Sequence, residues 1–252
     1  MLENIYQLCL IVILFISPVV FVALTFFKAP YGKFLRKGFG RGISSHLAWV
    51  IMELPAFLLI LSILFIEDFS ISLVTIVFVI IWEVHYIQRT FIYPFLIKNR
   101  QKKFPILLIF FGMLFNGLNA FTNSYFLIKY ASSYELGWLY SLPFIIGLGL
   151  FLIGYAINLH SDHILRNLRK SGETHYIIPR QGLFNYVSSP HYFGEVTEWL
   201  GWVIMTMSPA GLVFFIFTVA NLLPRARDNH KFYKQEFADY PIERKVLIPF
   251  IW

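Results

Sequence analysis

The chain has 252 residues, of which 58% are hydrophobic and only 14% are charged. In a soluble domain about a quarter of all residues are charged. The low charged fraction of this chain and its long apolar runs therefore exclude an ordinary soluble protein and indicate a membrane protein. The net charge of +7 could suggest a nucleic-acid partner. However, the basic residues cluster between the apolar runs, as in the cytoplasmic loops of membrane proteins, and we expect no nucleic acid.

Seven apolar runs predict an all-α polytopic membrane protein with about seven transmembrane helices. The runs cover residues 5–27, 44–66, 69–97, 104–128, 139–159, 191–207 and 210–223. The first run is too long and its start too poor in basic residues for a signal peptide, so we expect a retained helix. The last run is short for a crossing of about 20 residues, and we expect it to extend or tilt.

The segments between the runs alternate in charge. Residues 28–42 are basic, Glu67 and Asp68 make the next turn acidic, and residues 98–103 are basic again. Every second connection is therefore basic, and the positive-inside rule predicts an N-terminus outside and a C-terminus in the cytoplasm. We find no internal repeat or low-complexity linker, so we predict one transmembrane domain over residues 1–252.

An acid, Glu53, lies near the middle of the second run. An ionised carboxylate inside a bilayer costs several kcal/mol unless it is paired, faces water or is protonated. We therefore expect a neutral acid that can donate a hydrogen bond or a proton. Pro55 interrupts the helical hydrogen bonds two residues later and could open a pocket there. The alternative is a glutamate that only ties helices together.

Polar residues occupy one face of the helix predicted for the third run. These residues have the i, i+3, i+4 spacing of one helix face: Glu83, Tyr86, Arg89, Thr90 and Tyr93. A tyrosine hydroxyl there could bond a ligand oxygen, while Glu83 and Arg89 could form an internal ion pair. The alternative is a polar seam whose members satisfy one another. A joint site with the acid of the second run is the better interpretation.

Three asparagines lie on one face of the fourth run, at positions 116, 119 and 123. Asparagine side chains inside membranes often bond across helices. We therefore interpret them as packing residues.

A second polar stripe emerges from the fifth run toward the cytoplasm. Asn158, Asp162, Arg166 and Arg169 fall within about 80° of one another on a helix. Carboxylates suit hydroxyl groups and arginines suit phosphates, so this stripe could line a nucleotide. The alternative is a helix that binds acidic lipids. No GxGxxG or P-loop pattern occurs, so any nucleotide is held without a Rossmann fold.

The sixth run opens on Pro190, with His191, Glu195 and Glu198 in its first turns. Proline suits the first turn of a helix, and a helix N-terminus with a nearby glycine suits a phosphate or an amide group. The histidine and the two acids could also form a metal triad. Because the neighbouring segments are rich in arginine, we favour an anionic ligand and predict no metal site.

These residues together resemble the steroid 5α-reductase family of membrane-embedded, NADPH-dependent reductases, and we expect a bacterial-like member. The resemblance covers about residue 49 to the C-terminus, and the joint occurrence of its motifs is highly specific. The motifs are Glu53–Phe57, His85–Tyr93, Asn158–Arg169, Gly182–Ser188, Phe193–Trp199, Arg225–Ala226, Phe232–Tyr233, Asp239–Pro241 and Leu247–Ile251.

The resemblance implies seven transmembrane helices and reduction of the Δ4 double bond of a 3-oxo-Δ4-steroid to the 5α-dihydrosteroid. Glu53 and Tyr86 would be the catalytic residues and bond the C3 carbonyl, which makes the conjugated carbon electrophilic toward hydride. Trp49 and Phe115 would help to line the steroid site.

The resemblance also implies NADPH as the cofactor. The residues that it places at the cofactor are Asn158, Asp162, Arg166, Arg169, Tyr176, His191, Glu195, Arg225 and Tyr233. The chain departs from the family pattern at His191 and Asn229, where the family carries asparagine and histidine.

Two other enzyme classes are alternatives: a reductase of another lipid enone, enoyl or polyprenol substrate, and a membrane methyltransferase of the isoprenylcysteine or phospholipid type. The methyltransferase would need no acid at position 53. A transporter or receptor would not explain the cytoplasmic stripe. As partners we expect a steroid or related lipid and the membrane lipids, with the chain a monomer. The host would be the bacterial inner membrane or the endoplasmic reticulum, with the cofactor site facing the cytoplasm.

Overall fold

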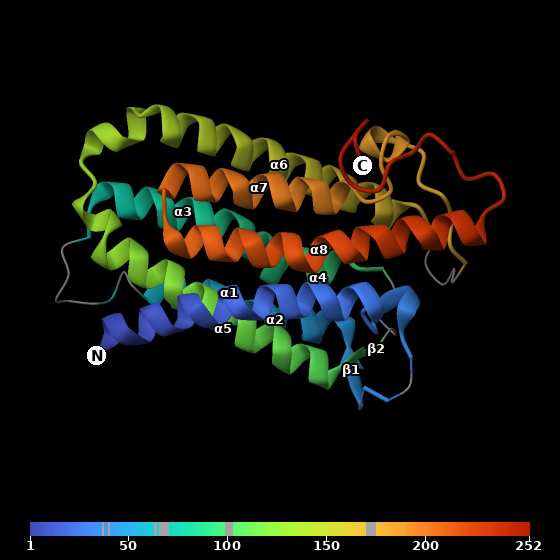
Figure 1. The fold of residues 1–252 in the computed structure, drawn as a ribbon, viewed down its shortest axis with the longest axis horizontal. Coiled ribbons are helices and arrows are strands. Elements are labelled where there is room, and N and C mark those ends of the chain that lie inside the picture. The colour runs from blue at the N-terminus through green and yellow to red at the C-terminus, as the bar shows by residue number, and fades with distance from the viewer. Residues whose placement is uncertain (37, 40, 63–64, 66–70, 99–102, 170–174) are drawn as a thin grey trace.

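Long helices running side by side make up the fold (Figure 1). The computed structural model describes residues 1–36, 38–39, 41–62, 65, 71–98, 103–169 and 175–252. The helices are α1 Leu2–Phe26, α2 Ser45–Ser62, α3 Leu73–Ile87, α4 Tyr93–Leu96, α5 Ile106–Lys129, α6 Leu142–Asn167, α7 Pro190–Thr206 and α8 Pro209–Glu236. A π turn, Gln88–Ile92, joins α3 to α4.

The predicted all-α polytopic architecture is confirmed. Within the described residues, six helical segments are long and apolar enough to cross a membrane, and the third of them runs from α3 through the π turn to Leu96. The seventh long helix, α7, has 17 residues. It packs along α6 and α8 and buries much of its length. Its contacts are therefore with protein more than with lipid. The acidic turn at Glu67 and Asp68 lies outside the described residues.

Two helices extend well beyond the apolar runs that predicted them. α6 continues to Asn167 and α8 continues to Glu236, where the predicted runs end at 159 and 223. Hydropathy marks only the part of a helix that lies in lipid. The polar turns beyond it remain helical and carry many of the candidate site residues.

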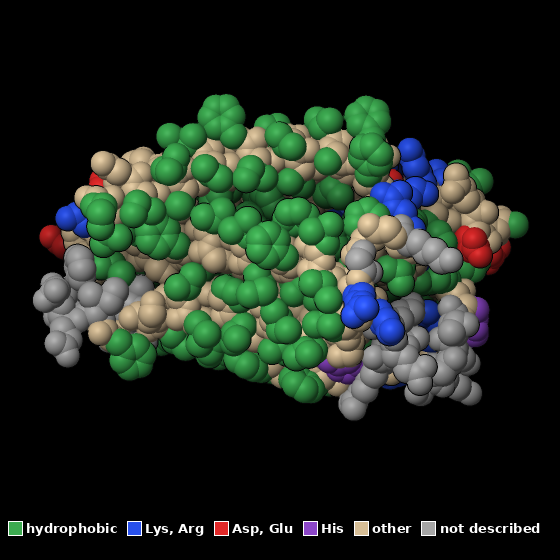
Figure 2. Space-filling view, turned by 90° about the horizontal axis from the view of Figure 1, so that it is seen from below, with side chains coloured by type: hydrophobic (Ala, Val, Ile, Leu, Met, Phe, Trp, Pro, Cys, Tyr) green, Lys and Arg blue, Asp and Glu red, His purple; other side chains and the backbone are tan. Residues whose placement is uncertain are grey.

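Both ends of the bundle carry polar groups, but the long connections share one end. The N-terminus lies at the opposite end from the C-terminal segment and from the strands β1 Gly42–Ser44 and β2 Lys103–Pro105 (Figure 1). These strands pair antiparallel, with Gly42 opposite Pro105. Figure 2 shows apolar side chains over the middle of one face and most of its Lys and Arg side chains toward one end. Such a surface suits a protein that is surrounded by lipid.

A glycine seam brings α6 and α7 into close contact. A Cβ atom at Gly154 would lie 2.3 Å from the backbone nitrogen of Glu198, and one at Gly194 would lie 2.6 Å from that of Asn158. Small residues allow membrane helices to approach to this distance. The seam therefore holds the polar stripe of α6 against the start of α7.

A cluster of aromatic side chains fills the centre of the bundle. Trp82 of α3 and Trp199 and Trp202 of α7 are almost completely buried. The indole nitrogen of Trp82 donates to the backbone oxygen of Ala56 in α2, at 3.1 Å. These contacts connect α2, α3 and α7 next to the candidate catalytic residues.

Candidate functional site

Glu53 lies on α2, and α5 supplies its neighbour. The Nδ2 atom of Asn116 donates to the Oε2 atom of Glu53 at 3.1 Å and to the backbone oxygen of Met52 at 2.7 Å. Pro55 lies inside α2, as the sequence predicted. The carboxyl group is therefore hydrogen-bonded within the bundle.

Tyr86 is buried on α3, within electrostatic range of Glu53. Its ring stacks on Trp82 with a centroid distance of 4.8 Å. Tyr86, Glu53, Arg89 and Glu195 all lie within electrostatic range of one another. Residues from α2, α3, α7 and the π turn thus influence one another within the bundle, and they include the acid and the tyrosine that the sequence singled out.

Arg89 lies in the π turn and connects that turn to both α6 and α7. Its Nη1 atom is 3.4 Å from Oδ2 of Asp162, and its Nη2 atom is 3.8 Å from Oε2 of Glu195. The guanidinium also lies over the rings of Trp49, at 5.2 Å, and Tyr93, at 4.9 Å. Arg89 therefore connects the candidate substrate wall with the candidate cofactor residues.

The predicted ion pair between Glu83 and Arg89 is wrong. Both carboxyl oxygens of Glu83 are buried, and neither has a hydrogen-bond partner among the described residues. The π turn begins at Gln88, between the two residues, and changes the helical spacing on which the prediction relied. Arg89 therefore faces α6 and α7.

Glu198 also has a partner that the sequence did not indicate. Its Oε1 atom lies 2.7 Å from Nδ1 of His85, and both side chains are buried. The metal triad weighed for α7 would have used this carboxylate together with His191 and Glu195. The pairing instead joins α7 to α3 next to Tyr86.

The polar stripe of α6 lies against the start of α7. Nδ2 of Asn158 donates to the backbone oxygen of His191 at 3.0 Å, and Asp162 is buried one turn further along α6. Arg169 follows just after the end of α6 at Asn167, and its guanidinium lies 4.9 Å from the ring of Tyr176. The structure therefore brings the α6 stripe together with α7 and with the loop that follows α6.

Several buried nitrogen atoms in this region lack a hydrogen-bond partner within the described parts of the chain. They are Nη1 of Arg166, Nη1 of Arg169, Nδ1 of His191 and Nε of Arg225. A buried donor that stays unpaired costs about 1–3 kcal/mol, and more when it is charged. A ligand rich in anionic oxygen atoms would satisfy the three guanidinium groups, so this donor set fits the phosphates of a dinucleotide.

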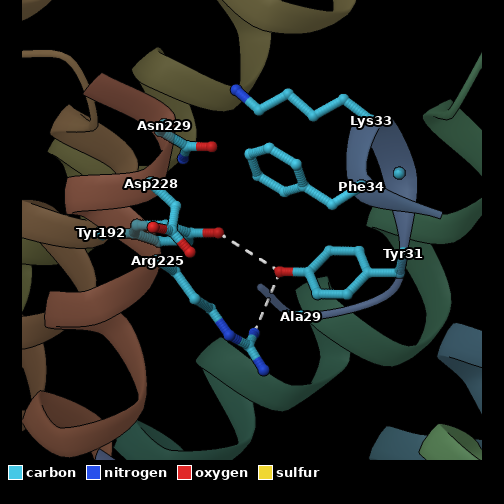
Figure 3. Close-up of a pocket in the computed structure, with 9 residues that line it drawn as sticks. Ala29, Tyr31, Lys33, Phe34, Tyr192, Arg225, Asp228 and Asn229 are labelled. Atoms are coloured by element: carbon cyan, nitrogen blue, oxygen red, sulfur yellow. Dashed lines mark hydrogen bonds between the residues drawn. The ribbon is translucent and has the colours of Figure 1, made fainter. Parts of the chain in front are cut away.

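A pocket beside Arg225 adds residues that the sequence did not single out. It comprises about 380 Å³ of space, part of which is open solvent, and lies between α7, α8 and the segment after α1 (Figure 3). Nη1 of Arg225 donates to the hydroxyl of Tyr31 at 3.0 Å, and that hydroxyl lies 3.4 Å from the hydroxyl of Tyr192. The residues that line the pocket are Ala29, Tyr31, Gly32, Lys33, Phe34, Tyr192, Arg225, Asp228 and Asn229.

Lys33 lines this pocket together with Arg225. Its Nζ atom lies 4.3 Å from the ring centroid of Phe232 and 4.6 Å from that of Tyr233. Burial lowers the pKa of Lys33 to about 7, although the charge of Asp228 opposes this shift. Lys33 therefore changes its charge near neutral pH. In the sequence it was one of several lysines in a basic loop, and no pattern set it apart.

The C-terminal segment closes over Tyr233. The ring of Tyr233 stacks on that of Tyr240 with a centroid distance of 5.6 Å. The hydroxyl of Tyr240 lies 2.6 Å from Oγ of Ser188, which is also 2.6 Å from Nδ1 of His230. This cluster holds the end of the chain against α8 and the segment before α7.

The remaining predicted residue, Phe115, lies on α5 next to α8. Its ring stacks on Phe217 with a centroid distance of 3.6 Å. Phe115 therefore belongs to the wall between α5 and α8, on the same helix as Asn116.

Comparison with known proteins identifies relatives over nearly the whole chain. A family profile described as 3-oxo-5-alpha-steroid 4-dehydrogenase matches residues 102–252. Steroid 5-alpha-reductase DET2 of Arabidopsis thaliana is 38% identical over 99% of this chain and 98% of its own. For 3-oxo-5-alpha-steroid 4-dehydrogenase 1 of Mus musculus the identity is 42%, over 94% of this chain and 93% of its own.

A third relative is 3-oxo-5-alpha-steroid 4-dehydrogenase 2 of Macaca fascicularis. It is 43% identical over 83% of this chain and 82% of its own. These relatives come from plants and mammals, so the expectation of a bacterial-like member finds no support in them.

Proposed function

The chain belongs to the 3-oxo-5-alpha-steroid 4-dehydrogenase family, and from this premise we propose that it reduces the Δ4 double bond of 3-oxo-Δ4-steroids with NADPH. The observation that carries this proposal is the meeting of Glu53 and Tyr86 with Arg89 and Glu195 inside the bundle. A carbonyl-binding pair thereby adjoins the polar residues of α6 and α7. The 5α-dihydrosteroid would be the product.

Glu53 and Tyr86 act on the C3 carbonyl of the substrate in this proposal. A carboxylic acid and a phenol each donate one hydrogen bond, and a carbonyl oxygen accepts two. Both donors draw electron density toward the oxygen, which makes C5 of the conjugated system electrophilic. They then stabilise the enolate that develops as C5 accepts hydride, and protonation of C4 converts this enolate into the saturated ketone. In a dry site these hydrogen bonds are stronger than in water.

The cofactor end comprises residues of α6, α7, α8 and the segment after α1. The unpaired guanidinium nitrogens of Arg166, Arg169 and Arg225 fit the phosphates, and Asp162 or Glu195 can accept from ribose hydroxyls. NADPH, when bound there, supplies the hydride. The full proposed set is Asn158, Asp162, Arg166, Arg169, Tyr176, His191, Glu195, Arg225 and Tyr233, to which Tyr31 and Lys33 are now added.

Trp49 and Phe115 are proposed to line the steroid, because Trp49 of α2 contacts Arg89 and Phe115 of α5 is adjacent to Asn116, which contacts Glu53. The cofactor residues share the end of the bundle that carries the basic loops, which supports a cytoplasmic cofactor site. The plant and mammalian relatives favour the endoplasmic reticulum over a bacterial inner membrane as host.

Substitution of the two carbonyl-binding residues tests these roles. Glu53→Gln and Tyr86→Phe remove one donor each with little change in shape, and each is expected to lower kcat about 100-fold or more. NADPH binding, measured by the shift of the thermal midpoint, is expected to persist. Full turnover in either variant would contradict the assignment of Glu53 and Tyr86 to the substrate carbonyl. A loss of NADPH binding with unchanged turnover per bound cofactor would contradict it as well.

A further inference from the structure

Asn116 makes an unusual pair of contacts for a residue that the sequence indicated as packing. Both of its donor bonds cross from α5 to α2, one to the backbone oxygen of Met52 and one to Oε2 of Glu53. Asn123, on the same face of α5, instead donates to Asn119 in its own helix and accepts from Trp202. Of the two, only Asn116 contacts the proposed catalytic acid.

The orientation of the Asn116 amide follows from its partners. A backbone oxygen can only accept a hydrogen bond, so the atom 2.7 Å from the oxygen of Met52 must be the amide nitrogen. The second hydrogen of that nitrogen then points to Oε2 of Glu53. The amide therefore presents a donor to the carboxyl group.

A donor at Oε2 determines where a neutral Glu53 carries its proton. In a carboxylic acid the carbonyl oxygen is the better acceptor, and the hydroxyl oxygen is the donor. An N–H group that points at Oε2 stabilises the form with the carbonyl at Oε2 and the proton at Oε1. No described protein group donates to Oε1.

We propose that Asn116 is a positioning residue for the reaction: it holds Oε2 of Glu53 as the carbonyl oxygen and so directs the acidic proton on Oε1 to the substrate carbonyl. This inference rests on the proposed role of Glu53. Without Asn116 the carboxyl group can rotate, and the two oxygens can exchange roles. The proton then points to the substrate for only part of the time.

The packing of α2 on α5 keeps this contact short. Gly112 lies one turn before Asn116, and a Cβ atom there would lie 2.9 Å from Sδ of Met52. The absence of a side chain at Gly112 lets α2 approach α5. The close approach at Met52 keeps the backbone oxygen and the carboxyl group of its neighbour within reach of one amide.

Kinetics of matched variants test the proposal. Asn116→Leu removes both donors at similar volume, and Asn123→Leu removes a buried amide of the same helix that does not contact Glu53. We expect Asn116→Leu to lower kcat/KM for the steroid about 10- to 100-fold per folded molecule. NADPH affinity should be unchanged. Asn123→Leu should lose thermal stability but keep kcat/KM within about threefold.

Infrared difference spectroscopy gives a readout that a purely structural role would not move. The band of the Glu53 carboxylic acid is identified by its absence in Glu53→Gln. Because a hydrogen bond to a carbonyl oxygen lowers its stretching frequency, we expect the band to shift upward in Asn116→Leu and to stay in place in Asn123→Leu. No carboxylic-acid band in the unmodified protein, or an unshifted band in Asn116→Leu, would overturn the proposal.

The same set of variants distinguishes the proposed role of Glu53 from that of Asn116. If Glu53→Gln retains full activity, the proposed role of Glu53 fails. If Glu53→Gln is inactive and Asn116→Leu is as active as the unmodified protein, only the positioning role of Asn116 fails.

Discussion

The glycine seam between α6 and α7 allows a perturbation whose size can be read from the structure. A Cβ atom at Gly194 would lie 2.6 Å from the backbone nitrogen of Asn158 and 2.6 Å from the backbone oxygen of Gly154, which is 0.8 Å inside the 3.4 Å of ordinary contact. Backbone atoms of a helix cannot move aside singly, so Gly194→Ala must push the two helices apart. Overpacking of this kind costs about 1–3 kcal/mol.

The displacement falls where the proposed cofactor residues of α6 and α7 meet. The hydrogen bond from Asn158 to the backbone oxygen of His191 is 3.0 Å long, and a separation of 0.8 Å takes it beyond hydrogen-bonding range. A misplacement of about 1 Å can cost two orders of magnitude in function. We expect Gly194→Ala to weaken NADPH binding roughly 10-fold or more, measured by titration of purified protein in detergent.

Two glycines of α6 are matched controls. A Cβ atom at Gly147 would lie 2.4 Å from the backbone nitrogen of Met205, on the same seam but near the start of α6, and one at Gly149 would meet nothing within 4 Å. Gly147→Ala should be destabilised by about as much as Gly194→Ala and should keep its NADPH affinity. Gly149→Ala should change neither the stability nor the NADPH affinity. Equal NADPH affinities in Gly194→Ala and Gly147→Ala would refute the assignment of the cofactor to this part of the seam.

Two further predictions concern charged residues. Arg89→Met leaves Asp162 and Glu195 without their shared cation, which should lower the free energy of unfolding by about 3–5 kcal/mol and weaken NADPH binding. Arg89→Lys should retain part of the stability and part of the NADPH affinity. An unchanged thermal midpoint in Arg89→Met would contradict this prediction. Burial lowers the pKa of Lys33 to about 7, so the side chain is protonated below that pH and neutral above it. Because only the protonated lysine attracts the anionic cofactor, the Kd for NADPH should rise between about pH 6 and about pH 8.5. Lys33→Arg stays charged and should flatten the dependence, and the same slope in both proteins would exclude Lys33 as its source.

The helices could be predicted from the sequence because lipid demands long apolar runs. The same demand made Glu53 conspicuous, since an acid in the bilayer is costly unless its surroundings compensate. Spacing along one helix also predicted the stripe from Asn158 to Arg166, because helical geometry alone places those side chains on one face.

Contacts between distant segments could not be predicted from a single sequence. Tyr31 meets Arg225 across 194 positions, and no periodic pattern connects a loop with a helix so far along the chain. The three asparagines of α5 share one spacing, so only the packing of α2 on α5 distinguishes Asn116. The wrong pairing of Glu83 with Arg89 has a local cause, because hydrophobic periodicity does not reveal a π turn.

Product analysis shows whether the protein carries out the proposed reduction. Purified protein in detergent is incubated with NADPH and testosterone or progesterone, with Glu53→Gln in parallel, and the steroids are separated from their 5α- and 5β-dihydro standards. We expect the 5α-dihydrosteroid, formed only with NADPH and strongly reduced in amount with Glu53→Gln. The absence of any dihydrosteroid, together with no shift of the thermal midpoint on addition of NADPH, would contradict the proposed reduction.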